Sequence, residues 1–351
     1  MYRVVSASRC GETCRIGRKL GGMMKKQLAA IARMVCCLGI SVCFAGQSAS
    51  ASNVDEKAVP ASACDYACLT GYLDQYLAAL VAHHPARLPL APHVKFTENT
   101  IAMKLGDALW GTISGLGTYK IYFADPHAGE AGCEVTIREN GTPAILVVRL
   151  KVAAKKITEV ETVVRRGAEP AQALEKMGQP NPVWLEPLAA AERTPRADML
   201  KDANLYFEGI VHLNGDIPPF DDTCNRILDG IQDTNNPSYN EGWANGKYNP
   251  AALGCRDNMN TKIWAYIKAV DPRRFMIVDE KMGIVFGFFM FNHPGTVLDA
   301  DVPGIGKIPM PPSAKRPFNV EVAEFFKIQN NKIRQVEGVQ LALPYKQPTG
   351  W

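Results

Sequence analysis

Apolar residues spaced three and four positions apart predict two amphipathic helices in this chain. The first covers residues 65–84 and is followed by Pro85, Pro89 and Pro92, which end it. The second covers about 194–213 and precedes Pro218. Each helix opens one half of the chain.

Short apolar or alternating segments follow each helix and predict antiparallel strands. In the first half they cover 94–97, 119–123, 134–138, 144–152 and 157–164, and Asn140-Gly141 is a hairpin signal. In the second half they cover 275–278, 284–291, 320–328 and 333–341. Both halves therefore read as a helix followed by a meandering sheet.

The last strands of the two halves repeat each other. Residues 151–161 read KVAAKKITEVE and residues 327–337 read KIQNNKIRQVE. The helices echo each other as well, with Tyr76 opposite Tyr206. The offset is 130 residues at the helices and 176 at the last strands, so the second half is 46 residues longer. Polar stretches at 230–262 and 294–317 supply the extra length, and long loops of this kind are often lids or binding loops.

The start of the chain resembles a secretory leader. Lys25-Lys26 forms a charged region, 34–45 is a short apolar run, and Ala49-Ser50-Ala51 offers a cleavage site. We therefore expect a periplasmic or secreted protein. The predicted segments are a leader at 1–51, a linker at 52–63, a first domain at 64–165, a connector at 166–192, a second domain at 193–345 and a tail at 346–351.

Charge argues against a nucleic acid partner once the leader is removed. The whole chain has 39 basic and 35 acidic residues, but residues 1–51 hold eight Lys and Arg and one Glu. The remainder has a net charge of −3 and no basic stripe with interleaved aromatics, so we expect no nucleic acid partner. We also expect no membrane association after leader removal. The partner we expect is a small molecule, bound by an intramolecular pseudo-dimer for which a monomeric state suffices.

Five cysteines remain after the leader, and export makes disulfides plausible. Cys224 and Cys255 bracket the long polar stretch, and we predict that they pair. Cys64 and Cys68 can pair if the first helical turn is irregular, which leaves Cys133, whose simplest fate is burial. No Cys or His spacing indicates zinc, and no glycine-rich loop follows a strand. We expect no metal and no cofactor.

The closing hairpin resembles that of the nuclear transport factor 2-like, SnoaL-like superfamily. The resemblance rests on AEFF at 323–326, Asn331-Lys332-Ile333 and Val336-Glu337. More narrowly, the segments beginning CDYACLTGYLDQYLAALVAHH and RRFMIVDEKMGIVFGFF resemble a secreted family of unassigned function. The resemblance implies an α+β fold of two tandem conical barrels, each with helices packed on a curved antiparallel sheet around an apolar pocket. Related folds include cofactor-free isomerases, dehydratases and lyases, and fold alone does not decide among them.

Glu324 is the first candidate for chemistry. It alternates with Val320, Val322, Phe326 and Ile328, so a carboxyl lies on an otherwise apolar strand face. The repeat places Val148 at the matching position of the first half. Burial would raise the pKa of this carboxyl toward the range of a general acid or base. The simpler interpretation is a structural ion pair with a buried arginine such as Arg226 or Arg274.

Further candidates come from the second half. His293, Tyr206 and Arg226 are the other predicted catalytic residues. His212, Asp222, Phe286 and Phe288 are predicted to bind the ligand. Four of them have a simpler interpretation: a surface His293, a core Tyr206, a His212 that faces the helix dipole, and an Asp222 that caps a helix.

Two functions follow from these residues. The first is an exported lyase, isomerase or dehydratase that uses general acid/base chemistry on a small carbonyl or aromatic compound. In it Glu324 is the base, Tyr206 or Arg226 stabilises developing negative charge, and His293 assists. The alternative is a non-catalytic binding protein for a hydrophobic small molecule, with a pocket lined by Phe286, Phe288 and Met290 or by Phe289 and Phe291. A structural module with filled cores and no pocket is the third class.

Overall fold

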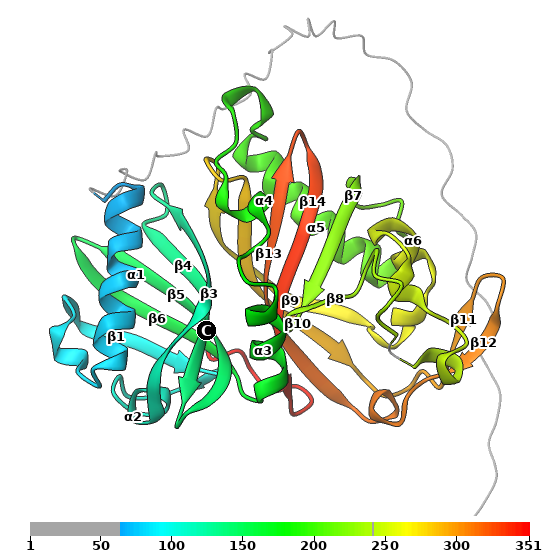
Figure 1. The fold of residues 1–351 in the computed structure, drawn as a ribbon, viewed down its shortest axis with the longest axis horizontal. Coiled ribbons are helices and arrows are strands. Elements are labelled where there is room, and N and C mark those ends of the chain that lie inside the picture. The colour runs from blue at the N-terminus through cyan, green and yellow to red at the C-terminus, as the bar shows by residue number, and fades with distance from the viewer. Residues whose placement is uncertain (1–63, 241) are drawn as a thin grey trace, which may run out of the picture. The chain divides into compact units, whose positions relative to one another are not determined.

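The computed structural model describes residues 64–240 and 242–351. The predicted leader with its cleavage site and the whole predicted linker at 52–63 lie outside these residues. Two similar halves follow one another along the chain, and each packs one long helix on a six-stranded sheet (Figure 1). The helices are α1 (Tyr66–Val81) and α5 (Arg196–His212). None of the described helices is long and apolar enough to cross a membrane.

The first sheet has the strand order β2-β1-β6-β5-β4-β3. Its strands are β1 (Leu90–Glu98), β2 (Ile101–Ala102), β3 (Ile113–Asp125), β4 (Glu130–Glu139), β5 (Thr142–Ala153) and β6 (Lys156–Arg165). Only β1 and β6 pair in parallel, and the other neighbours are antiparallel. A single turn, α2 (Leu109–Thr112), precedes β3.

The second sheet has the order β8-β7-β14-β13-β10-β9, which is the same arrangement. Its strands are β7 (Phe220–Leu228), β8 (Ile231–Gln232), β9 (Ala269–Asp279), β10 (Ile284–His293), β13 (Phe318–Gln329) and β14 (Lys332–Leu343). Its single parallel pair is β7 with β14. The prediction of a repeated helix-and-sheet unit is therefore confirmed.

The α+β class is confirmed, but neither sheet closes into a barrel. Each sheet ends on one side at a strand of two residues, β2 or β8, and on the other at β3 or β9. Those edge strands do not pair with each other in the described part of the chain, and a two-residue strand is too short to complete a barrel wall. The prediction of conical barrels is corrected to two open sheets.

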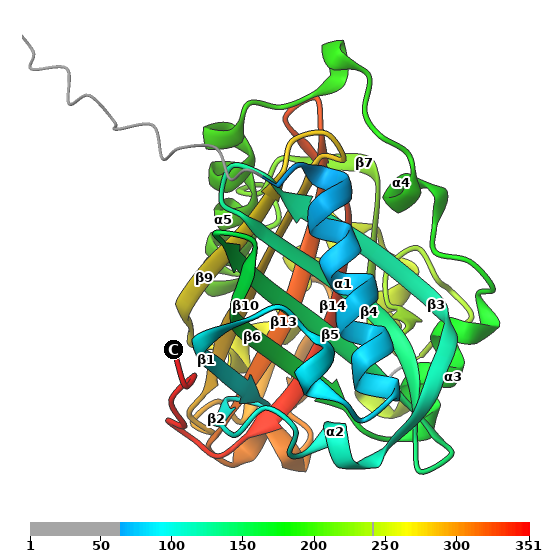
Figure 2. The ribbon, with the colours of Figure 1, turned by 90° about the vertical axis from the view of Figure 1, so that its left-hand side faces the viewer.

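Each sheet is buried on both faces. Helix α1 covers one face of the first sheet (Figure 2), and α5 covers one face of the second. The other two faces meet in a shared core that includes Phe123, Phe286 and Phe325. Alternation along β13 divides its side chains between these cores: Val322 and Phe326 face α5, whereas Ala323 and Phe325 face the first sheet.

The predicted connector contributes two helices to the shared core. These are α3 (Ala168–Lys176) and α4 (Pro182–Leu185), and they bury Leu174 and Trp184 between the halves. The Trp184 ring lies 4.8 Å from the ring of Phe325. The connector is therefore part of the packing between the halves.

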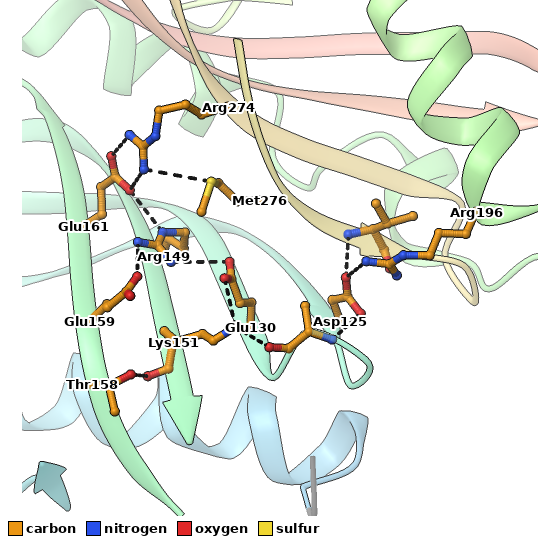
Figure 3. A network of polar contacts seen from close by, with 12 residues as sticks. Asp125, Glu130, Arg149, Lys151, Thr158, Glu159, Glu161, Arg196, Arg274 and Met276 are labelled. Carbon is orange, nitrogen blue, oxygen red and sulfur yellow. Dashed lines mark hydrogen bonds and ion pairs between the residues drawn. The ribbon is translucent and has the colours of Figure 1, made fainter. Parts of the chain in front are cut away.

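Charged side chains also join the halves (Figure 3). Arg274 of β9 donates to both carboxylate oxygens of Glu161 on β6, at 2.7 and 2.9 Å. Glu161 in turn accepts from the fully buried Arg149 at 3.0 Å. At another point Arg196 of α5 pairs with Asp125 at 2.5 Å. Ion pairs of this kind fix orientation, because breaking one leaves a charge buried without a partner.

The extra length of the second half folds into a small module beside α5. It contains α6 (Cys255–Asn260), the 3-10 turn Ile263–Tyr266, and a hairpin of β11 (Asp299–Val302) and β12 (Gly306–Pro309). These elements share a separate apolar core that includes Ile263, Val302 and Met310. Both polar stretches singled out in the sequence belong to this module.

Two disulfides are present among the described cysteines. Cys224 of β7 is bonded to Cys255 of α6, as predicted, and this bond ties the module to the sheet. Cys64 is bonded to Cys68 at the start of α1, which was one of the two open alternatives. Cys133 is free and buried.

Candidate functional site

A cavity of about 90 Å³ lies in the second half, between α5, the sheet and the added module. This volume is within a factor of two of the roughly 150 Å³ apolar cavity that takes up benzene. Its walls include Tyr206, Arg226, Trp264, Phe291, His293 and Glu324. The structure thus brings the four predicted catalytic residues to one place.

Glu324 supplies the carboxyl group of the cavity. It lies in the middle of β13, is 2% exposed, and has Val320 and Val322 beside it in the cavity wall. Its Oε2 atom has no hydrogen-bond partner among the described residues. Burial raises the pKa of this carboxyl to about 8, although Arg226 and a hydrogen bond with Tyr206 act in the opposite direction. Glu324 is therefore mostly protonated at neutral pH.

Arg226 lies close to Glu324 but is already paired with another carboxylate. Its Nε donates to both oxygens of Asp233 at 2.9 and 3.0 Å, and its Nη2 donates at 2.5 Å. The guanidinium also lies 4.0 Å above the ring of Trp264. Because Asp233 cancels most of its charge, Arg226 stabilises an ionised Glu324 only in part.

The simple interpretation of Glu324 as half of an ion pair does not hold. Among the described residues Glu324 forms no salt bridge, and Arg274 is engaged with Glu161 in the other half. A buried carboxyl without a charge partner is costly to keep in a fold, and such groups are concentrated at functional sites.

Tyr206 combines a core position with a place in the cavity wall. Its ring packs edge-on against Phe207 at 5.3 Å and Phe326 at 5.1 Å. Burial and the nearby Glu324 raise the pKa of its hydroxyl well above the usual value. The hydroxyl therefore stays protonated and can donate a hydrogen bond to an oxygen in the cavity.

His293 closes β10 and is buried, so the interpretation of a surface histidine is wrong. Its imidazole stacks at 4.2 Å on Phe318 and at 5.3 Å on Tyr266. Burial lowers its pKa to about 4, and its Nδ1 atom has no hydrogen-bond partner among the described residues. It is thus a neutral ring with one nitrogen available to a ligand.

The first half offers an internal comparison, because the two sheets share one strand register. Val336 is opposite Arg226 where Val160 is opposite Phe96, and the repeat pairs Glu324 with Val148. Met103 takes the place of Asp233 by the same offset. Tyr76, the counterpart of Tyr206, packs on Trp110 at 5.4 Å. The three charged positions of the second half are all apolar in the first.

A family model described as a domain of unknown function, DUF8021, matches residues 192–340. The matched segment runs from just before α5 into β14 and contains the whole cavity. No curated protein matches the chain.

The structure places the predicted ligand-binding residues away from the cavity. Phe286 and Phe288 point into the core between the sheets. Their neighbours Phe289 and Phe291 face α5, and Phe291 lines the cavity. The alternative pair was therefore the one on the cavity side, and strand alternation is the reason.

His212 and Asp222 also lie outside the cavity. His212 is exposed at the end of α5, where its Nε2 is 3.4 Å from Glu208 of the preceding turn. This fits the simpler interpretation of a histidine at a helix C-terminus. Asp222 is exposed on β7, in a separate polar groove beside the disulfide, and lies in a strand instead of capping a helix.

Sequence reasoning missed three residues of the site: Asp233, which directly follows β8, and Trp264 and Tyr266 of the added module. Asp233 holds Arg226, and Trp264 and Tyr266 form one wall of the cavity. The available signal was that these two aromatic residues directly follow the polar stretch at 230–262, which is found only in the second half. Among the described residues no group of three or more His, Cys, Asp or Glu is arranged to hold a metal ion.

Proposed function

We propose that this protein is an exported enzyme that uses Glu324 as a general acid and base, without a cofactor, in a lyase, isomerase or dehydratase reaction. The two halves are proposed to be tandem nuclear transport factor 2-like, SnoaL-like domains, of which only the second keeps a site. The two disulfides support the proposal of an oxidising, periplasmic or secreted location.

One observation carries the proposal: a buried carboxyl with an unpaired oxygen faces a cavity of ligand size. Its pKa of about 8 places it near the working range of a general base, since proton transfer is most efficient when the pKa lies near the ambient pH. The neighbouring hydroxyl of Tyr206 and the guanidinium of Arg226 are donors on the same side. Such chemistry needs an acid/base group, hydrogen-bond donors for the developing negative charge, and an apolar wall that limits the access of water.

The proposed step is proton abstraction next to a carbonyl. The reacting form is the ionised fraction of Glu324, which is the smaller fraction at neutral pH. Its carboxylate takes a proton from the carbon, the C–H electron pair forms a C=C bond, and the carbonyl π pair moves to the oxygen to give an enolate. Tyr206 and Arg226 donate hydrogen bonds to that oxygen. The protonated Glu324 then returns the proton to another carbon in an isomerisation. In an elimination, the enolate re-forms the carbonyl and a C=C bond, and the leaving group departs with its bonding pair and takes the proton from Glu324. Neutral His293 forms a hydrogen bond to that group.

The alternative proposal is a binding protein for a small hydrophobic molecule. The locked Arg226–Asp233 pair and the largely apolar wall favour it, because neither has to change when a neutral ligand enters. The two proposals differ in one respect: only the enzyme moves a proton.

The deciding experiment compares the wild type with Glu324→Gln in D2O. Small keto, hydroxy-carbonyl and phenolic compounds are followed by NMR without added cofactor. We expect deuterium uptake or product formation only with the wild type, and a loss of roughly 10²–10⁴-fold in the variant. Tyr76→Phe, at the matching helix position of the first half, is the control and should keep full activity. Line broadening by both proteins without turnover would instead establish the binding function.

A further inference from the structure

A second cavity, of about 290 Å³, adjoins the first and has no role in the proposed reaction. Its walls come from the end of β6, from α3 of the connector and from the turn between β7 and β8, and they include Arg165, Glu169, Asp229 and Asp233. Elements of both halves and of the connector therefore build it. We call it the outer chamber and the cavity at Glu324 the inner chamber.

Two side chains, Leu228 and Gln340, line both chambers. Both are only partly buried. The backbone N–H of Gln340 is held by Asp229 at 3.0 Å, but its side-chain amide makes no hydrogen bond to any described residue. Leu228 likewise has no polar anchor. The partition thus rests on two side chains that can change rotamer without breaking a hydrogen bond.

The ion pair beside the partition also belongs to both chambers. Arg226 lines the inner one and its partner Asp233 lines the outer one. A ligand group in the outer chamber would therefore lie close to the charges that set the protonation of Glu324. Such an arrangement couples recognition of a distal group to the reacting end of a ligand.

The charges of the outer chamber select the kind of group it would take. Its wall carries three carboxylates, from Glu169, Asp229 and Asp233, and one basic residue, Arg165. Arg165 is bonded to Asp229 at 3.0 Å, and Asp233 is held by Arg226 at 2.9 Å. Glu169 is therefore the carboxylate of this wall that pairs with no described basic residue, and it leaves the lining negative. The inner chamber is different, because its Arg226 is balanced and Glu324 and His293 are mostly neutral at pH 7.

We propose that the two chambers form one elongated site that binds a compound with a flat, uncharged head in the inner chamber and a positively charged arm in the outer chamber. This inference rests on the proposed function of the inner chamber and names the class of its substrate. The first half has no equivalent, since Glu98 and Val164 stand at the positions of Leu228 and Gln340, and Glu98 is bound by Arg166.

The test uses three probes with the same ring: phenol without an arm, tyramine with a cationic arm, and 4-hydroxyphenylacetate with an anionic arm. Binding is followed by NMR on the whole protein, through the indole N–H of Trp264 for the inner chamber and the amide of Ile231 for the outer. We expect tyramine to bind about tenfold more tightly than phenol, and the anion to bind more weakly than phenol. Only tyramine should shift both signals.

Two variants separate the chambers. Ile231→Trp, at a position that lines the outer chamber alone, fills that chamber and should remove the advantage of tyramine while phenol binding stays within about twofold. Glu169→Gln should reduce that advantage by about threefold. Gln179→Trp, at an exposed position beyond α3, is the matched control and should change neither.

The outcomes distinguish this inference from the proposed function. Phenol binding with no gain for tyramine, or equal binding of the anion, would overturn the elongated site and leave the inner chamber standing. Tyramine preference without proton exchange on any compound would support the elongated site and argue for a binding protein. If no probe perturbs Trp264, both the elongated site and the inner ligand site are refuted.

Discussion

Glu324 and Val148 stand at the same point of two related sheets, and the difference between them accounts for the site. In the first half the position is filled by an apolar side chain among Leu146 and Leu150. In the second half a carboxyl is buried there, next to an arginine whose charge is already balanced. Desolvation without a matching counter-charge keeps the carboxyl protonated near neutral pH.

Asp233 should control the protonation of Glu324 through Arg226. Asp233→Asn leaves the guanidinium without its partner, so its positive field favours an ionised Glu324 and the pKa of Glu324 should fall from about 8. The same change should cost about 3–5 kcal/mol of stability, because a buried charge is left unpaired. Urea unfolding and a carboxyl titration by NMR measure the two effects.

The exposed pair Asp216–Arg256, at 2.7 Å, provides the control for this prediction. Asp216→Asn should cost less than about 1 kcal/mol, since exposed ion pairs contribute little. An unchanged pKa of Glu324 in Asp233→Asn would show that Arg226 does not set it.

At the scale of elements, the added module of the second half makes the cavity. Its 3-10 turn Ile263–Tyr266 brings Trp264 and Tyr266 against the sheet, and the Cys224–Cys255 bond holds α6 to β7. The first half has neither the module nor a comparable bond among its described residues. An element inserted into a repeat thus converts a filled core into a lined cavity.

Removing the Cys224–Cys255 bond should loosen this module selectively. The paired change Cys224→Ala with Cys255→Ala should cost about 3–4 kcal/mol, given a separation of 31 residues. Removing Cys64–Cys68, four residues apart, should cost only about 2 kcal/mol in the same entropy treatment. Amide hydrogen exchange in α6 should become faster after the first change and not after the second. Equal effects of the two changes on α6 would contradict the claim that the Cys224–Cys255 bond holds α6 to β7.

Strand alternation and the internal repeat predicted much of the fold and part of the site. The alternation of 320–328 placed Glu324 on one apolar strand face, which the structure packs against α5, and the repeat identified Val148 as its counterpart. The run from Ile284 to Phe291 is apolar on both faces, because β10 is buried between α5 and the first sheet. In a strand that is buried on both sides, the side chains of both faces are apolar. The sequence therefore could not show whether Phe286 and Phe288 or Phe289 and Phe291 face the cavity.

At the scale of the whole molecule, the two halves share a core that also contains buried carboxyls. Glu337 accepts hydrogen bonds from Tyr119 at 2.6 Å and from Trp184 at 2.7 Å, which joins the second sheet to the first sheet and the connector. Burial raises its pKa to about 7, raises that of Glu321 to about 8, and raises that of Glu134 well above the usual value. The packing of the two halves against each other is therefore most stable while these carboxyls are protonated.

Stability should fall as pH rises toward 8. A carboxyl whose pKa is raised in the folded protein binds more protons there than in the unfolded chain, so its contribution is full below about pH 4.5 and is lost as pH approaches the folded pKa. Between pH 6.5 and 8 the loss should be about 1.4 kcal/mol per pH unit for each such group that remains protonated. Thermal melts over this window measure it.

The variant Glu321→Gln isolates the contribution of the surface between the halves. It should flatten the pH dependence of the melting temperature, because one of the titrating carboxyls is gone. His293 does not interfere, since its lowered pKa of about 4 confines its effect to more acidic solutions. A melting temperature that rises from pH 6.5 to 8 would contradict the assignment.

The central claim is that Glu324 remains protonated in its cavity near neutral pH and can exchange that proton with a ligand. The most direct test is a carboxyl ¹³C NMR titration of the glutamate-labelled protein, with Glu324→Gln used to assign the signal. We predict a midpoint near pH 8 for Glu324. A midpoint near about 4.3, the value of an exposed glutamate, would mean that the carboxyl is solvated or paired, and the proposed site would have no acid or base.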